Sequence, residues 1–241
     1  IPKMEADAPI KPKPDKVIEL PEDHKFGGHE AVNSLPGDRG LKDIVKRVGG
    51  LSSEEASLTL NGLIDYTGKT YCGAIKQLTD TGEGLTRLKD EALALDRYCK
   101  NAPTWNGGPL YRGISGTSPT HLLELKRACE SGEAISMHGI SSWSSEEDSA
   151  MKFAGGSNSV TGKTMLRCKE GSSWGTSVDV YSQFDDEHEV LVCSEARYKV
   201  SGYHDENGVM VFDLIEANPR VKHGEKHDRD DESDESKTDD L

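Results

Sequence analysis

Apolar residues recur at helical spacing from Leu41 to Cys99, which predicts helices that each bury one face. Ser52 and Glu55 form a capping-box pattern, the arrangement that satisfies the first free amides of a helix. We therefore expect one helix to begin directly after Ser52. A second amphipathic stretch over Leu85–Tyr98 predicts another helix in the same half of the chain.

After Pro109 the apolar pattern shortens to runs bounded by Gly, Ser, Asn and Asp, which is typical of strands. Two segments, His121–Cys129 and Glu146–Phe153, keep the helical period. Helices that lead into strands favour an α+β fold. The predicted strands are Leu110–Ile114, Thr164–Cys168, Ser177–Tyr181, Val190–Cys193, Tyr198–Val200 and Val209–Ile215.

Both ends of the chain differ in composition from its middle. Residues 1–36 are rich in proline and charge and predict an extended linker, because proline removes backbone donors and fixes φ. Residues 222–241 hold nine acidic and four basic side chains with almost nothing apolar, which predicts a disordered acidic tail. The folded domain is therefore expected over 37–221.

The chain has 241 residues, of which 34% are hydrophobic, and its formal net charge is −14. No apolar run approaches the roughly 20 residues that span a bilayer, so no membrane partner is expected. The excess of acidic residues repels phosphate backbones and argues against nucleic acid. We expect a protein or small-molecule partner.

The five cysteines are odd in number and widely spaced, so we interpret them as reduced and mostly buried thiols. His223 and His227 lie in the predicted tail, where solvated histidines are commoner than metal ligands. We predict no metal site.

Arg112 ends a short apolar strand and is followed by Gly113. A guanidinium in that position can bind phosphate oxygens through paired donors. The alternative is a surface arginine held in a salt bridge.

Ser142 and Ser144 flank Trp143 just before a predicted helix. A strand serine can orient a buried carboxylate, and the following helix start contributes a positive dipole end. The alternative is helix capping by Ser144 or the next serine.

Glu187 and Glu189 are two positions apart where a predicted strand enters the core. Alternation on a strand would place both carboxylates on one face, where one can accept a proton and the other can stabilise a developing cation. The alternative is an acidic hairpin end.

Together and in this order, the three segments resemble the Arg, Ser-x-Ser and Glu-x-Glu signature of the arginine-type mono-ADP-ribosyltransferases, a family that includes many bacterial toxins. Ala150 and Phe153 follow the second serine at the family's usual distance, and Ser182 matches its strand serine. The segment Ile64–Gly68 is similar to the Tyr-Thr segment of the family's first helices. The resemblance covers residues 41–217. Trp143 departs from it, since a small residue is commoner there.

The resemblance implies a fold of two packed antiparallel sheets that form an NAD cleft, preceded by helices. It implies transfer of ADP-ribose from NAD to an arginine of a target protein, with release of nicotinamide. NAD is then a co-substrate that binds without a Rossmann motif. The alternatives are an NAD glycohydrolase, and a catalytically dead relative that acts as a protein-binding module.

The resemblance also implies a role for each matching side chain. Arg112 would clamp NAD, Ser142 would hold Glu189, and Glu189 would bind the ribose and stabilise its developing charge. Glu187 would orient and help deprotonate the acceptor guanidinium. Further implied contacts to NAD are Tyr111, Gly113 and Ser144, and implied contacts to the target protein are Tyr181 and Phe184.

The start at Ile1, the proline-rich lead and the unpaired cysteines fit a toxin domain from a longer secreted or injected protein that acts in the cytoplasm of a target cell. A neutralising immunity-type protein is a further expected partner.

Overall fold

The structure is a computed structural model that describes residues 37–68, 70–155, 162–182, 184 and 186–220. The predicted linker over 1–36 and the predicted tail over 222–241 lie outside the described residues. No helix within the described ranges is long and apolar enough to cross a membrane.

The first half of the folded unit is helical, as the apolar period predicts. The helices are α1 (Gly37–Arg47), α2 (Ser53–Thr67), α3 (Cys72–Thr81) and α4 (Lys89–Asn101), and a 3₁₀ turn η1 (Thr86–Leu88) precedes α4. The capping box at Ser52 is confirmed: its hydroxyl accepts from the Glu55 amide, and the Glu55 carboxylate accepts from the Ser52 amide. The second predicted helix is confirmed too, but its regular part begins only at Lys89.

The second half supplies the strands and two helices. Their order is β1 (Leu110–Ile114), α5 (Pro119–Ser131), β2 (Ala134–Ser136), β3 (Ser141–Ser144), α6 (Glu147–Ala154), β4 (Lys163–Cys168), β5 (Gly175–Ser177), η2 (Asp179–Tyr181), β6 (Glu189–Val192), β7 (Arg197–Glu206) and β8 (Val209–Glu216).

The predicted strand Ser177–Tyr181 is wrong. Strand β5 ends at Ser177, and Asp179–Tyr181 forms the 3₁₀ turn η2. The amide of Tyr181 donates to the carbonyl of Val178 and closes this turn. The short apolar run was therefore a buried turn, which periodicity alone does not distinguish from a strand.

The strands hydrogen-bond in the continuous order β2-β7-β8-β4-β1-β3-β6-β5. The α+β fold class is confirmed, whereas two details of the expected sheets are corrected. Strands β4 and β8 pair in parallel, and the two halves of the sheet remain joined between β1 and β3. That junction consists of the single pair Tyr111↔Ser144, whereas the β1–β4 ladder has five pairs. The sheet is thus almost divided where the motif residues of β1 and β3 lie.

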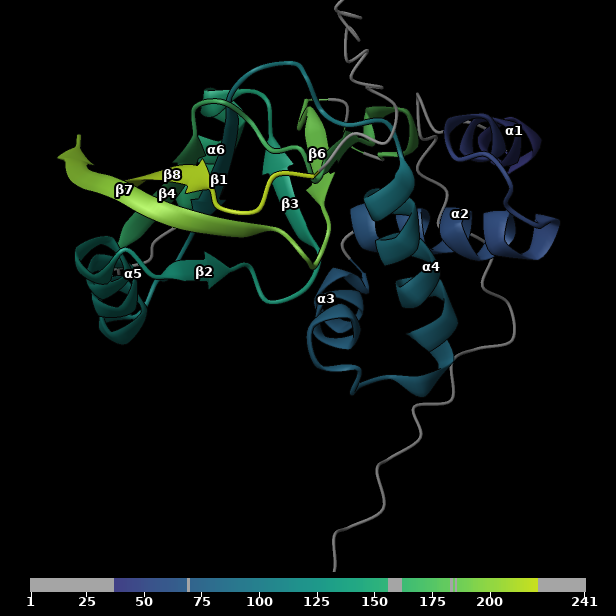
Figure 1. Cartoon of the computed structure of the whole chain (residues 1–241), viewed down its shortest axis with the longest axis horizontal. Helices are drawn as coiled ribbons and strands as arrows, with labels where there is room; N and C mark the ends of the chain where they lie inside the picture. Colours follow the sequence, from purple (N-terminus) through teal and green to yellow (C-terminus); the bar gives the residue numbers. More distant parts are fainter. Residues whose placement is uncertain (1–36, 69, 156–161, 183, 185, 221–241) are drawn as a thin grey trace, which may run out of the picture. The chain divides into compact units, whose positions relative to one another are not determined.

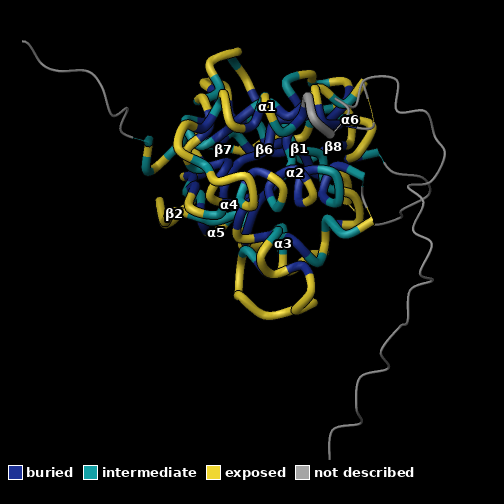
Figure 2. The backbone as a smooth tube through the Cα atoms, turned by 90° about the vertical axis from the view of Figure 1, so that its right-hand side faces the viewer, coloured by how far each residue is buried: buried dark blue, intermediate teal, exposed yellow. Residues whose placement is uncertain are grey.

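Strand β6 is buried on both faces, and side-chain alternation assigns each face to a different core. Leu191 packs in the core formed with α1–α4, whereas Val190 and Val192 pack in the core beneath the opposite face. Figure 1 shows α2, α3 and α4 beside the β3–β6 end, and α5 beside β7 and β2. In Figure 2 the buried backbone lies in the middle of the folded unit and the exposed stretches form its outer loops.

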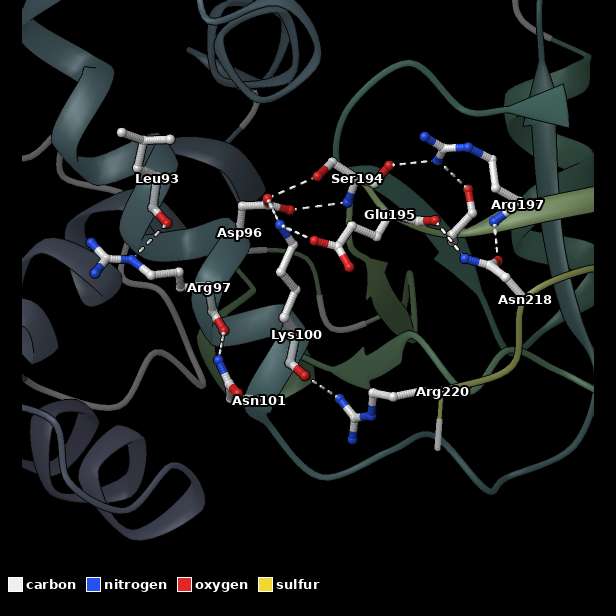
Figure 3. A network of polar contacts seen from close by, with 11 residues as sticks. Leu93, Asp96, Arg97, Lys100, Asn101, Ser194, Glu195, Arg197, Asn218 and Arg220 are labelled. Atoms are coloured by element: carbon white, nitrogen blue, oxygen red, sulfur yellow. Dashed lines mark hydrogen bonds and ion pairs between the residues drawn. The ribbon is translucent and has the colours of Figure 1, made fainter. Parts of the chain in front are cut away.

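A polar network also fastens α4 to the turn between β6 and β7 (Figure 3). The Asp96 carboxylate accepts from the Ser194 amide at 2.9 Å and from the Ser194 hydroxyl at 2.8 Å. Lys100 pairs with Asp96 at 2.8 Å and with Glu195 at 2.9 Å. Because the Asp96 side chain is almost buried, removing one of its partners would cost more than breaking an exposed ion pair.

The five cysteines form no disulfide, as the sequence predicts. Cys99, Cys168 and Cys193 are buried, and Cys72 and Cys129 are half-buried. Burial raises the pKa of Cys193 to about 11 and that of Cys168 to about 12, so both remain thiols at neutral pH. In the described part of the chain, no cluster of three or more His, Cys, Asp or Glu side chains is placed to hold a metal ion.

Candidate active site

A cleft of about 300 Å³ lies between helices α2, α3 and α6 and strands β1, β3 and β6. Every element that carries a sequence motif contributes to its wall. The lining residues are Tyr66, Thr67, Cys72, Gly73, Lys76, Tyr111, Arg112, Gly113, Ser142, Trp143, Ser144, Ala150, Phe153, Glu187 and Glu189. The structure thus brings together all the predicted catalytic and NAD-binding residues.

Glu189 is the first residue of β6 and is 4% exposed. It lies opposite Ser144 in the antiparallel β3–β6 ladder, and Ser142 is its diagonal neighbour. The Ser142 hydroxyl donates to Glu189 Oε1 at 2.6 Å, which fixes the orientation of the carboxylate. Glu189 shares its face of β6 with Leu191, so the carboxylate points toward the helices and into the cleft.

Arg112 lies in the middle of β1, is half-buried, and donates through Nη1 to the backbone carbonyl of Ser142. The contact holds the guanidinium beside the serine that orients Glu189. A cation and a carboxylate thus share one wall of the cleft, where a ligand with both an anionic part and a developing positive charge would bind.

Gly113, which follows Arg112, has a packing role that its motif position does not reveal. A Cβ atom there would lie 1.9 Å from the Ala150 carbonyl oxygen and 2.5 Å from the Ala154 amide nitrogen. Only a glycine allows α6 to lie this close to β1. Helix α6 carries Phe153, so the contact also sets one wall of the cleft.

Glu187 lines the cleft but lies outside β6, which corrects the expectation that both glutamates share one strand face. Between them, His188 adopts φ +45°, a left-handed conformation that few non-glycine residues adopt. The Ser144 hydroxyl donates to the Glu187 carbonyl at 2.7 Å and accepts from the Glu146 amide at 3.0 Å. A bend held by Ser144 therefore directs Glu187 into the cleft, and the same hydroxyl supports the start of α6.

The two residues expected to contact a target protein differ in exposure. Phe184 is 36% exposed, which fits that expectation. Tyr181 is 2% exposed, and its hydroxyl donates to the Asp43 carboxylate of α1. The expectation for Tyr181 is wrong, because a tyrosine with both ring and hydroxyl buried offers no surface to another protein.

Sequence reasoning missed Lys76, which lines the cleft from α3. Burial, and to a smaller extent the nearby charge of Arg112, lower the pKa of Lys76 to about 8 against the attraction of Asp80. The cleft thus holds a second cation whose charge changes near neutral pH. The sequence carried no signal for this role, because Lys76 reaches the cleft only through the packing of α3.

Tyr66, from the Tyr-Thr segment of α2, also faces the cleft and donates to the Ile140 carbonyl at 3.4 Å. Burial raises the pKa of Tyr66, so its hydroxyl stays protonated at neutral pH.

No protein-family model matches the sequence, and a search of curated proteins finds no match. Solved structures do match. Exoenzyme S from Pseudomonas aeruginosa, bound to carba-NAD and human 14-3-3 protein beta, has a TM-score of 0.52 at 20% identity, covering 80% of this chain and 94% of its own. C3stau2 from S. aureus, solved with NAD, has a TM-score of 0.51 at 12% identity, covering 76% of this chain and 94% of its own.

A third similar structure is the ADP-ribosyltransferase Vis, a toxin from Vibrio splendidus. Its complex with an inhibitor has a TM-score of 0.50 at 18% identity, covering 74% of this chain and 81% of its own. The chain therefore has the ADP-ribosyltransferase fold.

Proposed function

We propose that this protein is a mono-ADP-ribosyltransferase that transfers ADP-ribose from NAD to an arginine of a target protein and releases nicotinamide. The observation that carries the proposal is the buried Glu189 carboxylate, oriented by Ser142 and placed beside Arg112 in one cleft. Similar structures bound to carba-NAD and to NAD support NAD as the co-substrate.

Cleavage of the bond between nicotinamide and ribose produces positive charge on the ribose, as in glycoside hydrolysis. A carboxylate held in a site that excludes water stabilises such a charge more than an exposed carboxylate does. Glu189 meets both conditions, because it is buried and its orientation is fixed by the Ser142 hydroxyl. We assign Glu189 to the ribose and its developing cation.

The diphosphate of NAD is negatively charged and needs cationic side chains in the cleft. Arg112 and Lys76 supply them from opposite layers, one on a strand and one on a helix. We propose that both contact the diphosphate and so hold the dinucleotide across the cleft, with Tyr111, Gly113 and Ser144 as further contacts.

Lys76 makes NAD use depend on pH. As the pH rises through about 8, Lys76 of the enzyme without bound NAD loses its proton and no longer attracts the diphosphate. We expect kcat/KM for NAD, which reports the free enzyme, to fall over that range. Lys76→Met should lower kcat/KM about tenfold at pH 7, whereas Lys76→Arg should keep the activity and remove the fall. A fall that persists unchanged in Lys76→Arg would exclude Lys76 as its cause.

Arginine is proposed as the acceptor because Glu187 lines the same cleft as Glu189. A carboxylate can pair with a guanidinium through two hydrogen bonds and can accept its proton as the new bond forms. Vis, one of the similar structures, has been solved with agmatine, a guanidinium compound.

Glu187→Gln tests the acceptor. The variant should lose about 10²-fold of transfer to protein, because an amide cannot take the guanidinium proton, while NAD hydrolysis persists. Both activities are measured with labelled NAD, and the wild-type adduct is treated with neutral hydroxylamine, which releases arginine-linked ADP-ribose. An adduct that resists hydroxylamine would contradict arginine as the acceptor residue. Equal loss of transfer and hydrolysis in Glu187→Gln would contradict a role of Glu187 in activating the acceptor. Hydrolysis without any transfer by the wild type would favour a glycohydrolase.

Another similar structure, Plx2a from Paenibacillus larvae, is an ADP-ribosyltransferase toxin, which supports a toxin domain that is secreted or injected and acts in the cytoplasm of a target cell. Phe184, which is partly exposed and accepts from the amide of the cleft residue Glu187, is proposed as a contact to the target protein. A neutralising immunity-type protein remains a prediction.

A further inference from the structure

Helix α1 is connected to η2 by a compact group of polar contacts. The Tyr181 hydroxyl donates to Asp43 Oδ2, and Arg47 Nε pairs with the same oxygen at 2.7 Å. Arg47 also donates through Nη1 to the Ser177 carbonyl at 3.1 Å, and its guanidinium lies 5.8 Å from the centre of the Tyr181 ring. One ion pair on α1 thus holds both ends of the turn between β5 and Ser182.

The same turn begins the segment that leads to the catalytic glutamates. The Ser182 hydroxyl accepts from the Phe184 amide at 3.2 Å, and the Glu187 amide donates to the Phe184 carbonyl at 3.3 Å. Two successive hydrogen bonds, through Ser182 and Phe184, therefore link the Tyr181 anchor to Glu187.

The far end of this segment is held from the other side of the cleft. The Ser149 hydroxyl of α6 donates to the Asp186 carbonyl at 2.7 Å, and the Ser144 hydroxyl of β3 donates to the Glu187 carbonyl at 2.7 Å. The Thr67 hydroxyl of α2 adds a weaker bond to the Tyr181 carbonyl at 3.4 Å. The position of Phe184 and Glu187 therefore depends on α1 and α2 at one end and on β3 and α6 at the other.

We propose that α1 is a positioning clamp for the acceptor side of the cleft, with Asp43, Arg47 and Tyr181 as its working residues. The inference rests on the proposed function, since it assigns Phe184 and Glu187 to the acceptor. The Glu189 carboxylate is oriented by Ser142 and the β3–β6 ladder, and the turn reaches Glu189 only at its backbone, where the Val178 amide donates to the Glu189 carbonyl at 3.0 Å. Loosening the clamp therefore impairs transfer to the acceptor more than NAD hydrolysis, because the bond from Ser142 to the Glu189 carboxylate remains.

Tyr181→Phe tests the clamp, because it removes one hydroxyl and keeps the buried ring. A displacement of about 1 Å in a catalytic group can cost 10²-fold, so we expect the ratio of transfer to hydrolysis to fall about tenfold or more. The loss should appear mainly in KM for the protein acceptor. Asp43→Asn retains an oxygen that can accept from Tyr181 and should preserve more of the ratio than Asp43→Ala.

Tyr198→Phe is the matched control. The Tyr198 hydroxyl is also buried and bonds a polar partner, the Ser172 hydroxyl at 2.8 Å, but this pair joins β7 to the β4–β5 connection. A general loss of core hydrogen bonding would affect both variants alike. Only Tyr181→Phe should change the ratio of transfer to hydrolysis.

Hydrogen exchange measured by NMR gives a readout independent of activity. In Tyr181→Phe, the amides of Phe184 and Glu187 should exchange faster, while the amide of Leu191 within β6 should not change. Unchanged exchange together with an unchanged ratio in an active enzyme would overturn the clamp. If the wild type does not cleave NAD but the amides of Tyr181→Phe exchange faster, the proposed function is contradicted. The structural role of the clamp is then still supported.

Discussion

Replacing Glu189 with alanine should reduce nicotinamide release from NAD by about 10³-fold, the upper end of the effect of removing one preorganised electrostatic group. The reason is its position: a carboxylate that is 4% exposed and accepts the Ser142 hydroxyl at 2.6 Å has been oriented before the substrate binds. Its negative charge is then available to the ribose as positive charge develops. Nicotinamide release under saturating NAD measures the effect.

Two further variants separate charge from shape at this position. Glu189→Gln keeps the size and can still accept from Ser142, so a loss as large as that of alanine would assign the effect to the charge. Ser142→Ala leaves the carboxylate charged but without its orienting bond and should cost less than either. Wild-type-like release by Glu189→Ala, with an unchanged melting temperature, would contradict the assignment of this cleft.

The largest expected effect on stability is that of Gly113→Ala. The added Cβ would lie 1.9 Å from the Ala150 carbonyl oxygen and 2.5 Å from the Ala154 amide nitrogen. Both are backbone atoms of α6 that cannot rotate away. We expect a loss of about 3 kcal/mol and a fall of about 6 to 12 °C in melting temperature. Thermal unfolding followed by circular dichroism measures it.

Gly202→Ala is the control for that change. Gly202 also lies in a strand, β7, but nothing lies within 4 Å of the Cβ position there. The control should change the melting temperature by no more than a few degrees. Equal effects of the two substitutions would show that the close approach of α6 to β1 is not what requires glycine at position 113.

The elements could be predicted where local chemistry decides them. The capping box at Ser52 and the apolar run Val190–Cys193 each determine a structure within a few residues, and the structure has a helix after the first and the strand β6 at the second. The turn η2 was missed because Val178 and Tyr181 are apolar and buried, as in a strand, while the turn itself is set by α1. The parallel pairing of β4 and β8 joins segments far apart in sequence, which no local pattern encodes.

The same distinction applies to the candidate site. The contact between Ser142 and Glu189 follows from the order of motifs on adjacent strands, so the sequence resemblance anticipated it. Lys76 enters the cleft only because α3 packs against the β3–β6 end, and a lone lysine on a helix carries no signal of that. Glu187 was assigned to the right cleft for the wrong reason, since the bend at His188, not strand alternation, turns it inward.

The most direct test of the proposed function is to incubate the wild-type chain with NAD and agmatine and to quantify the products by mass spectrometry. We predict nicotinamide together with ADP-ribosylated agmatine, and neither product in quantity with Glu189→Ala. Intact NAD after prolonged incubation, both with agmatine and with a lysate that supplies protein acceptors, would contradict the proposal that this cleft cleaves NAD.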